Sequence, residues 1–125
     1  MLRVLIVDDE DVIRMALGRI FKKLGCEISE VDSIESALTS LSDQPYDLVL
    51  SDMRFPGDKS GTDLLEFVTE QKLDTKVVLM SCDMEDEAIT FLKNMGASKC
   101  MKKPFFKAEC QETLNSLFPE KLNVA

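Results

Sequence analysis

Residues 4–11 read Val4-Leu5-Ile6-Val7-Asp8-Asp9-Glu10-Asp11, an uninterrupted apolar run followed directly by a run of acids. An apolar run without alternation is typical of a central parallel strand that is covered on both faces. The acids then follow the carboxyl end of that strand, which is the edge where open α/β sheets bind their ligands. This stretch predicts an α/β fold with an acidic site at one edge of its sheet.

Strand-like and helix-like segments alternate along the whole chain. The expected strands are residues 4–7, 26–31, 47–50, 76–80 and 99–102. Apolar residues recur at helical spacing over residues 11–24, from a Ser33 cap to about residue 41, around 64–68, and over 88–95 and 105–117. This alternation predicts a single domain, residues 1–125, in which a five-stranded parallel sheet has helices on both faces.

The composition limits the classes of function. Fifteen Lys and Arg against 23 Asp and Glu give a net charge of −8, which argues against direct nucleic-acid binding. No apolar run approaches the ~20 residues of a membrane span, and none resembles a signal peptide. The four cysteines (Cys26, Cys82, Cys100 and Cys110) lack metal-ligand spacing, and the chain has no histidine. We expect reduced core or semi-buried thiols in a cytoplasmic protein.

The residues at the expected strand ends carry the chemistry. Asp8 and Asp9 follow the first strand, Asp52 the third, Ser81 the fourth and Lys103 the fifth. Converging carboxylates repel each other, and a hard cation such as Mg²⁺ relieves that repulsion beside a phosphoryl group. An aspartate can act as a nucleophile and form an aspartyl phosphate. Asp52 is the best candidate, because its central strand places it between the acidic pair and the lysine.

Each of these residues taken alone also has an ordinary explanation. The acids after the first strand could simply favour the dipole of a helix N-terminus. Asp52 could be a loop residue, Ser81 a strand-end cap and Lys103 a solvated surface lysine. Their joint occurrence at successive strand ends favours the acidic site.

Four groups of residues together resemble the response-regulator receiver family of two-component signalling. They are residues 4–11, residues 47–52 with Pro56, residues 77–81, and Gly96-Ala97 with Lys103-Pro104-Phe105. The resemblance covers essentially the whole chain. It implies a doubly wound, flavodoxin-like sheet with strand order 2-1-3-4-5.

The resemblance also implies a role for each site residue. Asp52 is the expected phosphoacceptor, and the expected metal site for Mg²⁺ or Mn²⁺ consists of Asp8, Asp9, Asp52 and the backbone carbonyl of Arg54. Ser81 takes the hydroxyl-switch role and Lys103 pairs with the phosphate. The Lys103–Pro104 peptide resembles the family's cis bond. The expected phosphodonor is a histidine kinase or a histidine phosphotransfer protein.

Two departures from the family pattern affect the expected read-out. Cys100 stands where the family commonly has Tyr or Phe, so coupling of the hydroxyl to an aromatic side chain cannot operate in that form. The loop from Pro56 to Gly61 looks one residue longer than usual.

In the fourth helix, Ile89 lies off the expected packed stripe of Ala88, Phe91, Leu92 and Met95. We therefore expect Ile89 to be exposed and, with Cys100, to contribute to a partner-binding surface.

Three neighbours of the site are expected to tune the lifetime of the phosphoryl group. We hypothesise that Arg54 and Asp83 meet across the site and hinder the hydrolytic water, and that Cys82 narrows access. If Arg54 and Asp83 are instead solvated, such an exposed ion pair contributes only ~0–1 kcal/mol to stability. Loss of phosphate at the parent rate by an Arg54→Ala, Asp83→Ala double variant would contradict the hypothesis.

Three other functions compete with the phosphoacceptor. A pseudo-receiver would use the same fold as a phosphorylation-independent binding module. A phosphohydrolase of the haloacid dehalogenase type would need Asp-x-Asp-x-Thr, whereas residues 9–12 lack the final hydroxyl. A flavin carrier would need a hydroxyl- and glycine-rich phosphate loop after the first strand, where this chain has acids. We expect a signalling domain rather than an enzyme, with a downstream protein effector, no membrane contact, and a monomer or phosphorylation-linked dimer.

Overall fold

A computed structural model describes residues 1–103 and 106–122 as one α/β unit. Five parallel strands form a single sheet in the order β2-β1-β3-β4-β5, as expected. The strands are β1 Arg3–Val7, β2 Glu27–Val31, β3 Leu48–Asp52, β4 Lys76–Ser81 and β5 Lys99–Lys102. The helices are α1 Asp11–Lys23, α2 Ile34–Asp43, α3 Gly61–Glu70, α4 Asp86–Asn94, α5 Lys107–Leu117 and α6 Pro119–Leu122.

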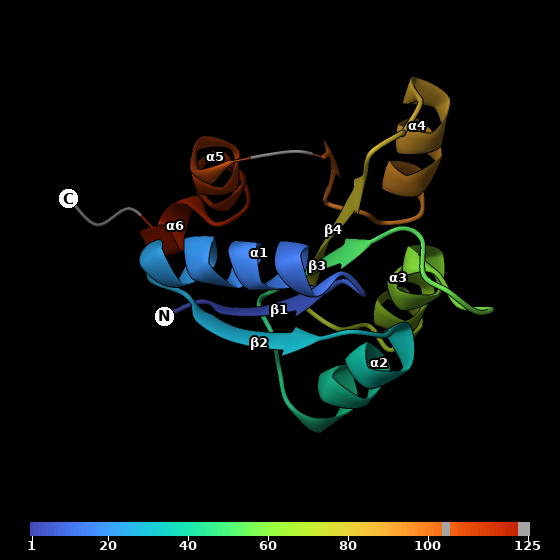
Figure 1. The fold of residues 1–125 in the computed structure, drawn as a ribbon, viewed down its shortest axis with the longest axis horizontal. Coiled ribbons are helices and arrows are strands. Elements are labelled where there is room, and N and C mark those ends of the chain that lie inside the picture. The colour runs from blue at the N-terminus through green and yellow to red at the C-terminus, as the bar shows by residue number, and fades with distance from the viewer. Residues whose placement is uncertain (104–105, 123–125) are drawn as a thin grey trace.

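Helices cover both faces of the sheet (Figure 1), and the sheet separates the core into two clusters. On one face, α1 and α5 pack Leu17, Phe21 and Leu114 against β1, β3 and β4. On the other face, α2, α3 and α4 enclose a second cluster that includes Leu64 and Leu92. Both faces of the central strands are therefore buried, which is why β1 and β3 read as continuous apolar runs.

Most of the expected boundaries hold to within a few residues. The Ser33 hydroxyl accepts a hydrogen bond from the Ser36 N–H, which confirms Ser33 as the cap of α2. The third helix starts earlier than its apolar residues indicate, because Ser60 and Asp63 form a capping box. The short helix α6 begins at Pro119, where the sequence predicts only the end of α5. The expected cis Lys103–Pro104 bond lies outside the described residues.

The expected orientation of α4 is wrong. Ile89 is half-buried and packs against the core, whereas Phe91 is 56% exposed and Ala88 is exposed. Leu92 is the only residue of α4 that is fully buried. Met84, in the loop before the helix, is buried in the same cluster as Leu92. The inward face is therefore rotated from the predicted stripe towards Ile89.

The cysteines also differ from one another in burial. Cys26 and Cys110 are buried and Cys100 is half-buried, as expected, but Cys82 is exposed. All four are free thiols, in agreement with the prediction.

No helix in the described part of the chain has the length and apolar character to cross a membrane.

Candidate phosphoacceptor site

The register of the sheet brings the predicted site residues to one edge. Ser51 pairs with Val7, so Asp52 and Asp8 leave their strands at the same level. Asp52 pairs with Met80, and Ser81 pairs with Lys102, which places Lys103 one step further along. Parallel strands thus turn a separation of up to 95 residues along the chain into direct contact.

Lys103 is the cationic centre of this edge. Its Nζ lies 2.9 Å from Oδ2 of Asp8 and 3.3 Å from Oδ2 of Asp52. Burial alone would lower the pKa of Lys103, but its hydrogen bond to Asp8 and the charge of Asp52 raise that pKa above its usual value. Lys103 therefore stays protonated and holds the two carboxylates together.

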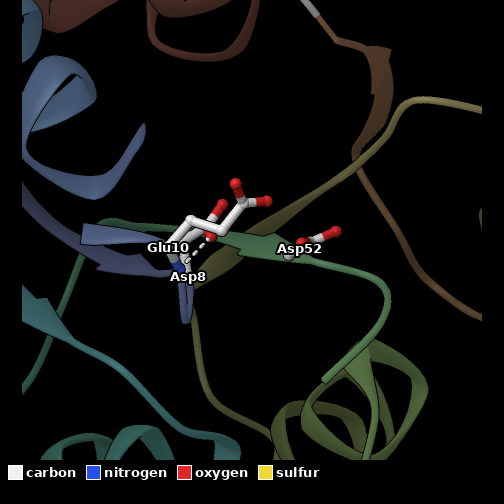
Figure 2. Close-up of side chains that lie close together, drawn as sticks. All are labelled: Asp8, Glu10 and Asp52. Atoms are coloured by element: carbon white, nitrogen blue, oxygen red, sulfur yellow. Dashed lines mark hydrogen bonds between the residues drawn. The ribbon is translucent and has the colours of Figure 1, made fainter. Parts of the chain in front are cut away.

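The acidic group differs in one member from the one expected. Oxygen atoms of Asp8, Glu10 and Asp52 all lie within 4.8 Å of one another, and Figure 2 shows these three side chains at the end of the sheet. Asp9 is exposed and does not belong to this group. Carboxylate oxygens are the ligands that Mg²⁺ prefers, so this group fits a divalent cation. The structure does not test the predicted metal roles of Asp9 and the Arg54 carbonyl.

A local hydrogen bond explains why Glu10 joins the site. The Glu10 N–H donates to Oδ1 of Asp8 at 2.9 Å, the contact drawn as a dashed line in Figure 2. This Asx-type turn folds the chain back at Asp9 before α1 begins. The sequence places four acids in a row at residues 8–11, but it does not show which of the acids after Asp8 turns inward.

The main chain around Asp52 is held from several sides. The Ser51 hydroxyl donates to the Asp52 carbonyl at 2.8 Å, and the Met53 N–H donates to the Met80 carbonyl at 3.0 Å. A Cβ atom on Gly61 would lie 2.9 Å from the Asp52 carbonyl oxygen, so the start of α3 passes too close for any other residue. Asp52 is therefore fixed by its backbone, while its carboxylate remains partly exposed.

Ser81 adopts a local arrangement. Its hydroxyl accepts from the Asp83 N–H at 3.2 Å and donates to the Asp83 carbonyl at 3.3 Å. Its own carbonyl accepts from the Lys103 N–H at 2.9 Å, which ties the ends of β4 and β5 together. The hydroxyl lies at the predicted strand end. It can donate to another acceptor in place of the Asp83 carbonyl.

The expected contact between Arg54 and Asp83 is not formed. Both residues are exposed, and among the described residues no ion pair joins them. Cys82 is exposed and lines a groove beside Lys103. Cys100 packs against the core, and burial raises the pKa of its thiol. The tuning and read-out roles of these residues remain predictions.

An apolar groove of about 320 Å³ adjoins Lys103. Its described lining consists of Val12, Ile13, Ala16, Leu17 and Ile20 of α1 together with Cys82 and Lys103. Val12 is 81% exposed. The surface next to the acidic edge is thus apolar, in contrast to the charged edge itself.

Comparison with known families agrees with this geometry. The family model described as the response regulator receiver domain matches residues 4–115. This chain belongs to that family. The edge that gathers Asp8, Asp52, Ser81 and Lys103 is therefore one edge of the sheet in a receiver domain of two-component systems.

Two curated relatives show the range of proteins that contain such a domain. This receiver domain is 32% identical over 120 residues to the sensory/regulatory protein RpfC of Xanthomonas campestris, covering 93% of this chain but 16% of that protein. It is 31% identical over 121 residues to sporulation initiation phosphotransferase F of Bacillus subtilis, covering 97% of both chains. The match thus spans a small part of the first relative and nearly all of the second.

A solved structure is similar throughout. The response regulator TrrA of Thermotoga maritima, crystallised in complex with Mg²⁺ and BeF, aligns with a TM-score of 0.82 and 30% identity. The alignment covers 94% of this chain and all of that one. The doubly wound, flavodoxin-like fold expected from the sequence is confirmed.

Proposed function

We propose that Asp52 accepts a phosphoryl group from a phosphohistidine donor, with the help of Mg²⁺ or Mn²⁺, and that the change alters how the domain binds a downstream protein. The observation that carries the proposal is the position of the Lys103 ammonium group between Asp8 and Asp52, 2.9 and 3.3 Å from their carboxylates. Family membership supports a signalling role.

The proposed reaction is an in-line transfer to a carboxylate. An oxygen of Asp52 forms a bond to phosphorus while the bond from phosphorus to the donor imidazole breaks, and the imidazole nitrogen keeps the electron pair. The Lys103 ammonium balances charge on the phosphoryl oxygens, and the Ser81 hydroxyl exchanges Asp83 for one of them. A divalent cation would be held by Asp8, Glu10 and Asp52, with Asp9 and the Arg54 carbonyl as further ligands, and would neutralise the transferring group.

The groove beside Lys103 suits a protein donor. A donor must bring its phosphorylated side chain to Asp52, and the apolar lining from α1 offers contact area next to that point. The expected donors are a histidine kinase or a histidine phosphotransfer protein in the cytoplasm. The single-domain boundary at residues 1–125, and a monomer or phosphorylation-linked dimer, belong to the same proposal.

The experiment is phosphorylation by a small acyl phosphate, followed by intact mass. The parent protein with Mg²⁺ should gain one phosphoryl group, while Asp52→Asn and a sample with chelator should gain none. Equal labelling of the parent and Asp52→Asn would place the acceptor elsewhere. An unlabelled parent that also fails to accept phosphate from histidine phosphotransfer proteins would favour the phosphorylation-independent binding module.

A further inference from the structure

Arg14 holds both ends of the turn that carries the acidic side chains. Its main-chain N–H donates to the Glu10 carbonyl at 3.0 Å, as the first hydrogen bond of α1. Its guanidinium Nη1 donates to the Asp8 carbonyl at 2.8 Å. The two bonds bracket Asp9, so one residue ties the main chain of residues 8–10 to the helix.

The guanidinium group is itself fixed by two further acids. Its Nη2 donates to Oδ1 of Asp11 at 2.6 Å, and its Nε lies 3.6 Å from Oε1 of Glu30 on β2. The Arg14 side chain is 16% exposed. A planar fork that donates to two acceptors and forms an ion pair with a third group has little freedom to rotate, so it can hold the Asp8 carbonyl in one position.

The ion pair between Glu30 and Arg14 depends on a glycine in α1 that leaves space for the Glu30 carboxylate. A Cβ atom on Gly18 would lie only 2.7 Å from Oε2 of Glu30, so the absence of a side chain at Gly18 leaves room for this carboxylate. Gly18 is buried beneath it. Contact therefore runs from β2 through Glu30 to Arg14 and on to the acidic turn.

We propose that Arg14 is a positioning residue of the phosphoacceptor site: by holding the Asp8 carbonyl, it sets where the carboxylates of Asp8 and Glu10 lie relative to Asp52. The inference rests on the proposed function. Both oxygens of Asp8 are engaged, Oδ1 by the Glu10 N–H and Oδ2 by Lys103, each at 2.9 Å. A small rotation of the main chain at Asp8 would therefore disturb both contacts together.

The test separates geometry from charge. Arg14→Lys keeps the positive charge but has one nitrogen in place of the fork, and Arg14→Met removes the charge as well. Arg19, an exposed residue of the same helix, supplies the matched controls Arg19→Lys and Arg19→Met. Affinity for Mn²⁺ alone is measured from the paramagnetic signal of the free ion, and stability is measured by denaturant unfolding.

Both Arg14 variants should bind Mn²⁺ about 10- to 100-fold more weakly than the parent, the usual effect of losing a residue that orients metal ligands. The Arg19 variants should bind like the parent. Parental affinity in Arg14→Lys would overturn the inference, because charge alone would then suffice. Tighter binding by Arg14→Met would overturn it too, as would a loss of stability without a change in affinity.

Two additions keep the test decisive. If the Arg14 variants do not fold, Gly18→Ala displaces Glu30 without touching Arg14; it should weaken Mn²⁺ binding in the same direction, and unchanged binding would contradict the inference. A parent protein that neither binds Mn²⁺ nor becomes phosphorylated would refute the proposed function itself. A parent that does both, with Arg14 variants that behave identically, would refute only the role of Arg14.

Discussion

The ammonium group of Lys103 forms an ion pair with the carboxylate of Asp8 at 2.9 Å, and the two side chains are 8% and 0% exposed. The pair joins the end of β5 to the end of β1, with Asp52 of β3 lying between these strands in the sheet. Buried carboxylates repel each other strongly unless a cation lies between them. Lys103 supplies that cation from the protein itself.

Removal of the Lys103 ammonium group should destabilise the protein. Lys103→Met leaves Asp8 buried without its charged partner, and we expect the free energy of unfolding to fall by about 3 kcal/mol. Lys102→Met, at the neighbouring exposed position, is the matched control and should change little. Denaturant unfolding without divalent ions measures both. Equal stabilities of the two variants would show that the pair contributes nothing measurable.

The position of Glu10 predicts an effect on metal affinity. Glu10→Gln removes one of three clustered carboxylates, and we expect Mg²⁺ to bind about tenfold more weakly, by analogy with other residues around metal sites. Titration calorimetry measures the affinity, with Asp9→Asn beside it. Unchanged affinity in Glu10→Gln, together with a large loss in Asp9→Asn, would restore the set expected from the sequence and exclude Glu10.

The sequence predicted the strands and their ends because parallel strands buried on both faces leave a plain signal. Runs such as Val4–Val7 admit few alternatives, and the register of a parallel sheet then brings Asp8, Asp52, Ser81 and Lys103 to one edge. Arg14 was not recognised, because nothing in the spacing of a helical arginine shows that it reaches back to the preceding turn.

The orientation of α4 could not be predicted for a different reason. Both Ile89 and Phe91 are compatible with helical stripes that contain Leu92, so apolar spacing alone permits two rotations of the helix. In the loop before the helix, Met84 is buried and the Ser81 hydroxyl closes a turn on Asp83. Neither contact leaves a periodic signal in the sequence.

The corrected orientation predicts opposite effects at the two positions. Ile89→Ala should lower the free energy of unfolding by about 1–2 kcal/mol, below the usual range for a fully buried isoleucine because Ile89 is only half-buried. Phe91→Ala should leave stability unchanged within about 0.5 kcal/mol, as for other surface positions. Thermal unfolding of both variants measures this. A larger loss in Phe91→Ala would restore the orientation expected from the sequence.

The buried thiol of Cys110 predicts a dependence of stability on pH. Burial, reinforced by the charge of Glu109, raises the pKa of this thiol from 9.0 to about 11. Between these pH values the folded protein binds more protons than the unfolded chain, so stability should fall as pH rises through this window and be unaffected below it. The loss is about 3 kcal/mol at most.

Comparison with Cys110→Ala isolates this effect. The variant should show a shallower decline in the free energy of unfolding over the same alkaline range, even if the smaller side chain lowers stability at every pH. Denaturant unfolding at a series of pH values gives both slopes. Parallel slopes would mean that the Cys110 thiol ionises with equal ease in the folded and unfolded states.

The central claim is that Asp52 carries the phosphoryl group, and chemical mapping of the acceptor tests it most directly. Protein treated with Mg²⁺ and a small acyl phosphate is reduced with borohydride, which converts an aspartyl phosphate to homoserine, and is then digested for peptide sequencing by mass spectrometry. We predict homoserine at position 52 and unmodified aspartate at positions 8 and 9. Homoserine at another acidic residue, or at none in protein whose intact mass shows the phosphoryl group, would contradict the account.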